Sequence, residues 1–125
     1  MFWPATKVMG VLVTVSPTPY KQRVANAVNG AAEFIAIERR RPTEELWIEH
    51  ESAGPGYGIL TDACVDAIKL AAQREGMLLD PVYTGKTFAG LIGSVRNGKI
   101  SQGSRVLFVH TGGSPALYQY APQLV

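Results

Sequence analysis

The chain has 125 residues, of which 46% are hydrophobic and 18% charged, and its formal net charge is +2. This balance is typical of a folded globular domain, and it excludes a disordered chain and a broad basic surface for nucleic acid. No apolar run approaches the roughly 20 residues of a membrane-spanning helix, and the first residues lack the pattern of a signal peptide. We therefore expect one domain over residues 1–125, with neither a membrane nor a nucleic acid as partner.

The single cysteine, Cys64, excludes an internal disulfide and favours a reducing compartment, so we expect a cytoplasmic protein. Cys64 falls on the apolar side of a predicted helix, which favours a core position over a nucleophilic role. The one basic cluster, residues 39–41, is interpreted as a solvated helix end, because cations are favourable at helix C-termini.

The first part of the chain predicts a strand, a helix and a second strand. Residues 7–15 are apolar and β-branched, which is the pattern of a central strand. Thr18 is then placed to cap a helix with Pro19 as its first residue. Apolar spacing predicts this helix over residues 20–37, and residues 46–50 (LWIEH) predict a short edge strand.

The second part predicts three more helices and one buried strand. Thr61 caps a helix that ends near Gly76, residues 77–82 form a short extended segment, and residues 83–86 form a turn. A third helix follows, with one apolar face and an end at residues 97–98; that face consists of Phe88, Leu91, Ile92 and Val95. Residues 106–109 predict a buried parallel strand, followed by a glycine turn and a helix from Pro115. This alternation predicts a three-layer α/β domain in which a mostly parallel sheet is flanked by helices.

Three glycine-containing turns lie beside predicted strand or helix ends: residues 54–58 (GPGYG), 83–86 (YTGK) and 110–113 (HTGG). Such turns let a ligand approach the backbone, although a glycine turn alone is more often structural. The chain has neither phosphate-loop nor dinucleotide fingerprint, which weakens a nucleotide-binding interpretation. The two histidines are far apart and no cysteine pair exists, so no metal site is predicted.

Tyr57 and Tyr83 stand inside two of these turns. A tyrosine hydroxyl needs a lowered pKa, or a cofactor's help, to move protons near neutrality. Together with their surroundings, residues 54–58, 76–86 (GMLLDPVYTGK) and 110–117 (HTGGSPAL) resemble, in order and spacing, the D-cysteine desulfhydrase and 1-aminocyclopropane-1-carboxylate (ACC) deaminase family. The resemblance implies a pyridoxal-phosphate enzyme of the tryptophan synthase β superfamily, with part of a fold type II large domain. It covers only the carboxyl-terminal part of the family.

The resemblance also implies roles by position. Tyr57 matches a tyrosine on the substrate side of the cofactor, and Tyr83 matches a second tyrosine near the cofactor ring, where it would act as nucleophile or base. Thr84 and Thr111 match positions near the pyridine nitrogen, and Gly112 lets the backbone lie against the ring. The deaminase branch has glutamate and leucine at the two threonine positions, so the desulfhydrase branch is favoured. A neutral hydroxyl leaves the nitrogen unprotonated, which suits β-elimination, whereas a carboxylate would strengthen the electron sink.

The family's Schiff-base lysine, in an asparagine-lysine motif, has no match here, and Lys86 does not align with it. The loops for the substrate carboxylate and the cofactor phosphate also have no match. We therefore expect a fragment of a desulfhydrase-like lyase, with little or no turnover as a lone chain. An intact relative would act on a small D-amino acid such as D-cysteine and release pyruvate, ammonia and sulfide. The alternatives are an ACC deaminase fragment, or a non-catalytic assembly module whose edge at residues 8–15 pairs with a second copy or with a complementing amino-terminal half.

Overall fold

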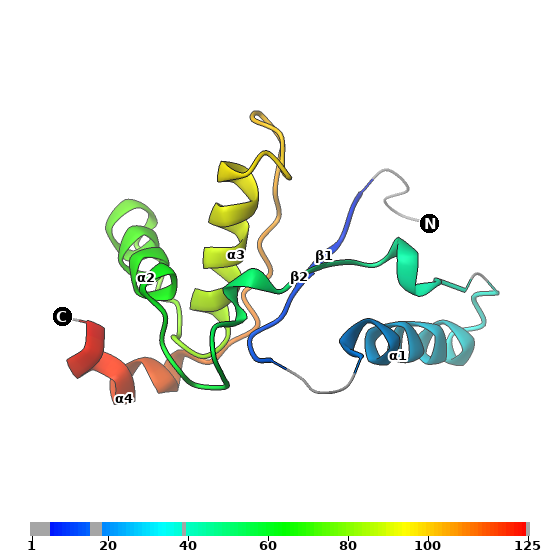
Figure 1. Ribbon diagram of the computed structural model, residues 1–125, viewed down its shortest axis with the longest axis horizontal. Coiled ribbons are helices and arrows are strands. Elements are labelled where there is room, and N and C mark those ends of the chain that lie inside the picture. The colour runs from blue at the N-terminus through cyan, green and yellow to red at the C-terminus, as the bar shows by residue number, and fades with distance from the viewer. Residues whose placement is uncertain (1–5, 16–18, 39, 125) are drawn as a thin grey trace. The chain divides into compact units, whose positions relative to one another are not determined.

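The computed structural model describes residues 6–15, 19–38 and 40–124. Its elements follow one another along the chain in this order: β1 (Met9–Val11), α1 (Tyr20–Phe34), η1 (Thr43–Glu45), β2 (Trp47–Glu49), η2 (Glu51–Ala53), α2 (Asp62–Glu75), α3 (Thr84–Arg96) and α4 (Ser114–Leu124) (Figure 1). The chain divides into two compact units, Met1–Gly10 with Ser16–Glu49, and Val11–Val15 with His50–Val125. No helix in the described ranges is long and apolar enough to cross a bilayer.

The strands β1 and β2 pair in a small parallel sheet, and both are shorter than predicted. Gly10 allows this pairing to be close, because a Cβ added there would lie 3.1 Å from Cδ1 of Ile48. The predicted strands over residues 7–15 and 46–50 are correct in place but too long. Strand structure persists only where a partner strand can accept and donate the ladder hydrogen bonds, and the paired stretch has three residues on each side.

The helix α1 begins at Tyr20, as predicted, but Pro19 is the cap residue and not the first helical residue; Thr18 lies outside the described residues. The helix ends at Phe34 instead of Ile37 because the chain reverses at Ala36, whose φ is +55°. There Ile37 N donates to Ala32 O at 2.8 Å and Ala36 N donates to Glu33 O at 3.1 Å. This is the Schellman pattern of helix termination, with alanine at the left-handed position that glycine usually occupies.

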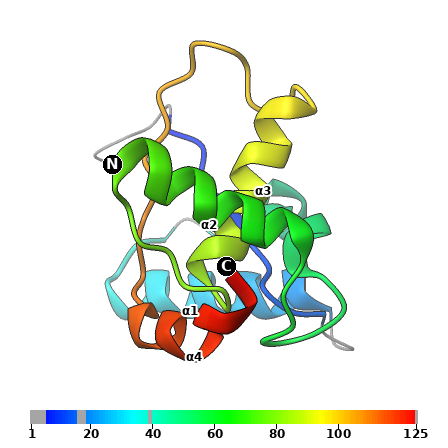
Figure 2. The same ribbon diagram turned by 90° about the vertical axis from the view of Figure 1, so that its left-hand side faces the viewer.

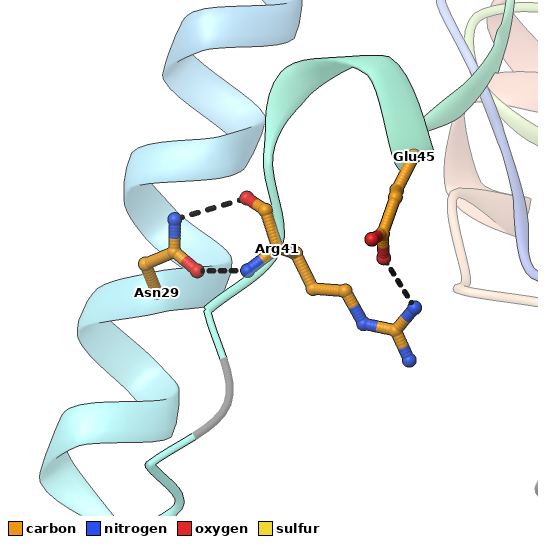
Figure 3. A network of polar contacts seen from close by, with 3 residues as sticks. All are labelled: Asn29, Arg41 and Glu45. Atoms are coloured by element: carbon orange, nitrogen blue, oxygen red, sulfur yellow. Dashed lines mark hydrogen bonds and ion pairs between the residues drawn. The ribbon is translucent and has the colours of Figure 1, made fainter.

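A side-chain amide ties the end of this reversal back to α1 (Figure 3). Arg41 N donates to Oδ1 of Asn29 at 2.7 Å, and Nδ2 of Asn29 donates to Arg41 O at 3.1 Å. The guanidinium of Arg41 also forms an ion pair with Glu45 at 2.9 Å. Arg40 and Arg41 therefore lie beyond the helix, and the predicted helix-end cluster is wrong for both; Arg39 is outside the described residues.

In the second unit, α2 and α3 lie side by side (Figures 1 and 2). The buried centre of their core consists of Cys64, Ile68, Ala71 and Leu79, and the partly buried residues around it are Leu60, Met77, Phe88, Phe108, Leu117 and Leu124. Cys64 is fully buried, as predicted, and burial raises the pKa of its thiol to about 11. The thiol therefore stays protonated and packs as a small apolar group.

The boundaries of α2 are the predicted ones because both are set by local chemistry. Oγ1 of Thr61 accepts a hydrogen bond from Cys64 N at 3.2 Å, which satisfies one of the free donors of the first turn. At the other end, Gly76 adopts the left-handed conformation with φ +63°, and Met77 N donates to Ala71 O at 3.2 Å. The helix therefore ends at a glycine that its backbone conformation requires.

The helix α3 differs from its prediction at both its start and its buried face. It begins at Thr84, within the segment predicted as a turn. Its buried residues are small or polar: Thr84, Gly85, Lys86, Ala89, Gly90 and Ser94. The predicted apolar face is less buried, and Val95 is 47% exposed. Small residues are required because α2 approaches closely: a Cβ on Gly85 would lie 2.8 Å from Cγ1 of Ile68 and 2.9 Å from Sγ of Cys64.

Residues 106–109 are neither a strand nor buried, so the prediction of a buried parallel strand is wrong. Leu107 is 89% exposed and Val109 is 67% exposed, while Phe108 packs edge to face on Phe88 with ring centroids 5.3 Å apart. Residues 77–82, the other predicted extended segment, also form no strand, and residues 81–82 belong to a turn. Within the described ranges the only strands are β1 and β2, so these two segments have no ladder partner there.

Candidate active site

Two tyrosines predicted as site residues meet in the second unit. The hydroxyls of Tyr57 and Tyr83 share a hydrogen bond, and their rings stand edge to face with centroids 5.8 Å apart. Tyr57 lies in residues 54–58, here named the tyrosine loop, and Tyr83 directly precedes α3. The bond to Tyr83 raises the pKa of Tyr57. The two side chains are 59% and 41% exposed respectively, so the pair stands at an open surface where a ligand can reach it.

The buried carboxylate of Asp80 organises the start of α3. Oδ1 accepts from Val82 N at 2.8 Å and from Tyr83 N at 2.7 Å, while Oδ2 accepts from Thr84 N at 2.8 Å and from Oγ1 of Thr84 at 2.6 Å. Burial opposes ionisation of this carboxyl, but the hydrogen bonds from Thr84, Tyr83 and Val82 outweigh that cost and lower its pKa. Asp80 is therefore an anion that holds the backbone beneath Tyr83 in place.

The third motif, residues 110–113, is here named the glycine turn, and it packs against the same carboxylate. A Cβ added to Gly113 would lie 2.5 Å from both Cγ and Oδ2 of Asp80, so only glycine allows this approach. His110 fixes the other end of the turn: its Nε2 lies 2.9 Å from Leu78 O, and its Nδ1 accepts from Gly112 N at 3.3 Å. An accepting Nδ1 leaves the proton on Nε2, so Nε2 donates to Leu78.

Lys86 joins the tyrosine loop to α3. Its side chain is fully buried, and Nζ donates to three backbone carbonyls: Val13 at 3.0 Å, Ala53 at 2.7 Å and Gly56 at 2.9 Å. A second contact holds the far end of the loop, where the hydroxyl of Tyr120 in α4 donates to Gly58 O at 2.8 Å. The three glycine motifs thus converge on one place, through contacts made by residues from α3, α4 and the segment before α3.

The predicted site residues divide into two groups. Tyr57 and Tyr83 are in direct contact, and Thr84 lies beside them, but its hydroxyl is buried and fully used: it donates to Asp80 and accepts from Asp80 N at 2.9 Å. Thr111 and Gly112 lie in the glycine turn, where Thr111 is exposed and Gly112 has a φ of +109°. A Cβ on Gly112 would meet nothing within 4 Å, so open space adjoins the turn on that side.

Two residues central to this site, Asp80 and Lys86, were not among the predicted site residues. Asp80 had a local signal, because an aspartate followed by proline and a turn favours hydrogen bonds to the next backbone N–H groups. The sequence signal for Lys86 was weaker: Lys86 shares a helical face with Ala89 and Gly90, where an exposed lysine is not expected. Its acceptors are 30 to 73 residues away in the chain, and no local pattern identifies them.

The chemistry of these donors suits the ring of an aromatic cofactor better than its phosphate. The backbone N–H groups at the start of a helix can bind a phosphate. At the start of α3, however, these N–H groups already donate to Asp80. The exposed hydroxyls of Tyr57 and Tyr83, the open space beside Gly112 and the exposed Thr111 instead offer neutral hydroxyl groups and bare backbone. Such a surface fits a planar ring with a polar nitrogen.

The fold and the motifs of this site point to the class of pyridoxal-phosphate dependent enzymes. Residues 1–112 match the family described as pyridoxal-phosphate dependent enzyme, and the chain belongs to that family. It is 40% identical over 114 residues to a probable ACC deaminase of Schizosaccharomyces pombe, and 39% identical over 121 residues to the D-cysteine desulfhydrase of Salmonella paratyphi C. These matches cover 91% and 97% of this chain, but only 34% and 36% of the two relatives.

A solved structure supports the same relationship. The crystal structure of an ACC deaminase homologue matches with a TM-score of 0.77 and 33% identity, over 93% of this chain and 34% of the other. The chain therefore has the α/β fold of part of a fold type II pyridoxal-phosphate enzyme, which confirms the predicted fold class and family. It spans about a third of the length of the relatives that it matches.

Proposed function

We propose that this chain supplies one wall of the active site of a pyridoxal-phosphate lyase that acts on a small D-amino acid such as D-cysteine. The observation that carries the proposal is that the three glycine motifs come together around the start of α3, where the hydroxyls of Tyr57 and Tyr83 share a hydrogen bond. In this proposal residues 1–125 are one part of the large cofactor domain. The cofactor, when bound, supplies the ring that accepts the electron pair released at the substrate's α-carbon.

The chain's own residues then hold the ring and move a proton. Tyr83 would act as the nucleophile or base, and Tyr57, whose pKa is raised by its hydrogen bond to Tyr83, stays protonated at neutral pH on the substrate side. Thr111 is assigned the pyridine nitrogen because it matches that position in the family, and its exposure supports this assignment. Thr84 adds a neutral group beneath the ring, but its hydroxyl proton is donated to Asp80, so it acts by positioning.

The pair of threonines supports elimination over ring-opening deamination. A hydroxyl partner carries no charge, so it leaves the pyridine nitrogen unprotonated and the electron sink weak. Elimination of a sulfur leaving group, which departs readily, needs less stabilisation of that electron pair. The same proposal assigns the protein to the cytoplasm, which is supported by its only cysteine being a buried free thiol.

The experiment combines this chain with the amino-terminal part of the D-cysteine desulfhydrase of Salmonella paratyphi C and measures sulfide released from D-cysteine. We expect pyridoxal-phosphate-dependent release that Tyr83→Phe lowers about 100-fold, the usual range for losing a proton-transfer group. Tyr118→Phe is the control, because Tyr118 is 81% exposed in α4. Full activity of Tyr83→Phe, or cleavage of ACC in preference to D-cysteine, would contradict the proposal.

A second candidate function is non-catalytic assembly, which the exposed apolar segment over residues 106–109 favours. Leu107 and Val109 are exposed, and they have no strand partner in the described ranges. An unpaired apolar segment of this kind is a template for another strand. Size-exclusion chromatography of the chain at several concentrations tests this function, and a strictly monomeric, folded species would count against it.

A further inference from the structure

The ammonium group of Lys86 is enclosed by backbone carbonyls from three separate places in the chain. Its acceptors, Val13 O, Ala53 O and Gly56 O, lie 2.7 to 3.0 Å from Nζ, and the side chain is fully buried. An ammonium has three N–H donors, so this arrangement uses all of them. A neutral amine would keep two donors and turn its lone pair toward the third carbonyl. The enclosure therefore fits the charged form, although burial lowers the pKa of Lys86.

Two of the carbonyls that Lys86 binds lie close in sequence to Tyr57. Gly56 directly precedes Tyr57, and Lys86 follows Tyr83 by three residues in the first turn of α3. One charged group therefore connects the two chain segments that carry the tyrosine pair. The loop has little freedom of its own here, because Gly54, at φ +69°, passes so close to Thr61 that a Cβ would lie 2.5 Å from Cγ2 of Thr61.

We propose that Lys86 is a positioning residue, whose buried ammonium closes the tyrosine loop onto α3 and thereby brings the Tyr57 hydroxyl to Tyr83. Its catalytic consequence rests on the proposed function, in which this pair faces the substrate. The positioning of the loop by Lys86 does not rest on the proposed function, because the contacts of Lys86 are made within this chain and need no cofactor. Lys86 thus acts through Tyr57 and touches no reacting atom.

The test follows the ionisation of Tyr57 in the 125-residue chain, by ultraviolet absorbance of tyrosinate as the pH is raised. The phase that belongs to Tyr57 is identified by its loss in Tyr57→Phe. Lys86→Met removes the charge but keeps the length of the side chain, and we expect it to move this phase toward lower pH as the hydroxyls separate. In the Tyr57→Phe background the same substitution has no such phase to move, and any remaining change is assigned to Tyr120, whose hydroxyl also bonds the loop.

Lys69→Met is the matched control, because Lys69 is an exposed lysine of α2. It should leave the Tyr57 phase unchanged. An unchanged Tyr57 phase in Lys86→Met with an intact helical signal, or an equal shift in Lys69→Met, would overturn the proposal. No cofactor is present in these titrations, so failure to bind pyridoxal phosphate would refute the proposed function and leave this result standing.

A second variant decides the case in which Lys86→Met does not fold. Lys86→Ala leaves space for a small cation among the three carbonyls, and it is titrated with methylammonium chloride and, separately, with sodium chloride. Recovery of the helical signal and of the high-pH Tyr57 phase in methylammonium alone supports the enclosure as a specific site for an ammonium group. Equal recovery in the two salts, or recovery in neither, would show that an ammonium group with directed N–H donors is not what holds the loop, and would refute the proposal.

Discussion

Replacement of Gly113 by alanine gives the sharpest test of the site's construction. The new methyl group would lie 2.5 Å from Cγ and Oδ2 of Asp80, well inside van der Waals contact, at a backbone φ of +90°. Gly112→Ala is the matched control, since its φ is +109° but its Cβ would meet nothing within 4 Å. Both variants carry the backbone strain, and only Gly113→Ala also displaces the carboxylate.

The cost of each variant follows from these contacts. Alanine at such a φ costs about 1–3 kcal/mol of folding free energy. In Gly113→Ala the carboxylate must also move away from Thr84, whose N and Oγ1 donate to Oδ2 at 2.8 and 2.6 Å. Loss of one hydrogen bond to a charged acceptor costs about 1.5–3 kcal/mol. We therefore expect Gly113→Ala to be about 2 kcal/mol less stable than Gly112→Ala.

The measurement is urea unfolding followed by the helical circular dichroism signal, from which the free energy of unfolding of each variant is extrapolated. A second readout is proteolysis near the start of α3, which should increase in Gly113→Ala alone. Equal stability of the two variants would refute the reasoning, because it would mean that the contact between the glycine turn and Asp80 does not constrain the folded chain.

Three further variants test the elements around the site. Asp80→Asn leaves buried N–H donors facing an amide and should lower the free energy of unfolding by about 3 kcal/mol at neutral pH. Because the folded-state pKa of Asp80 is lowered, the wild-type advantage is present above the unfolded pKa of about 3.9 and is lost as the pH falls through the folded pKa. Urea unfolding at neutral and acid pH should therefore show the stabilities of the two proteins converging at acid pH. Gly85→Ala should destabilise the protein by about 1–3 kcal/mol through overpacking against α2. In Gly93→Ala, in the same helix, the new Cβ meets no atom within 4 Å, and the substitution should stabilise the protein by about 0.5–1 kcal/mol. Stability changes of the same sign for both variants in thermal unfolding would contradict the packing described. Ala36→Gly should raise the free energy of unfolding by about 1 kcal/mol, because glycine adopts the left-handed conformation of this position without strain. Gly76→Ala, at the corresponding end of α2, should lower the free energy of unfolding by a similar amount. An unchanged melting temperature in Ala36→Gly would show that the reversal after α1 is not strained.

The sequence predicted those features whose causes are local. Thr61 and Gly76 mark the ends of α2 because a cap hydroxyl and a left-handed glycine act within one helical turn. Tyr57 and Tyr83 were selected as site residues by matching three motifs to a known family, which did not predict that their hydroxyls are in contact.

Features that depend on distant partners were not predictable in this way. An apolar run such as residues 106–109 becomes a strand only if another strand lies beside it, and periodicity does not reveal the partner. Lys86 shows the same limit for a polar group, because its three acceptors come from segments that only the folded chain brings together. The end of α1 was misplaced for a different reason, since alanine at the left-handed position of Ala36 hides a signal that glycine would give.

The three carbonyls around Lys86 also bear on how the protein responds to its medium. The occupancy of such a site by a dissolved cation would depend on the concentration of that cation. The ammonium of Lys86 is attached to α3 through a four-carbon chain, so its occupancy of the site does not depend on the solution. Because the charge is buried, mobile ions screen it little. The loop that carries Tyr57 should therefore keep its conformation across changes in ionic strength and in the identity of the alkali cation, without any ion having to be acquired from outside.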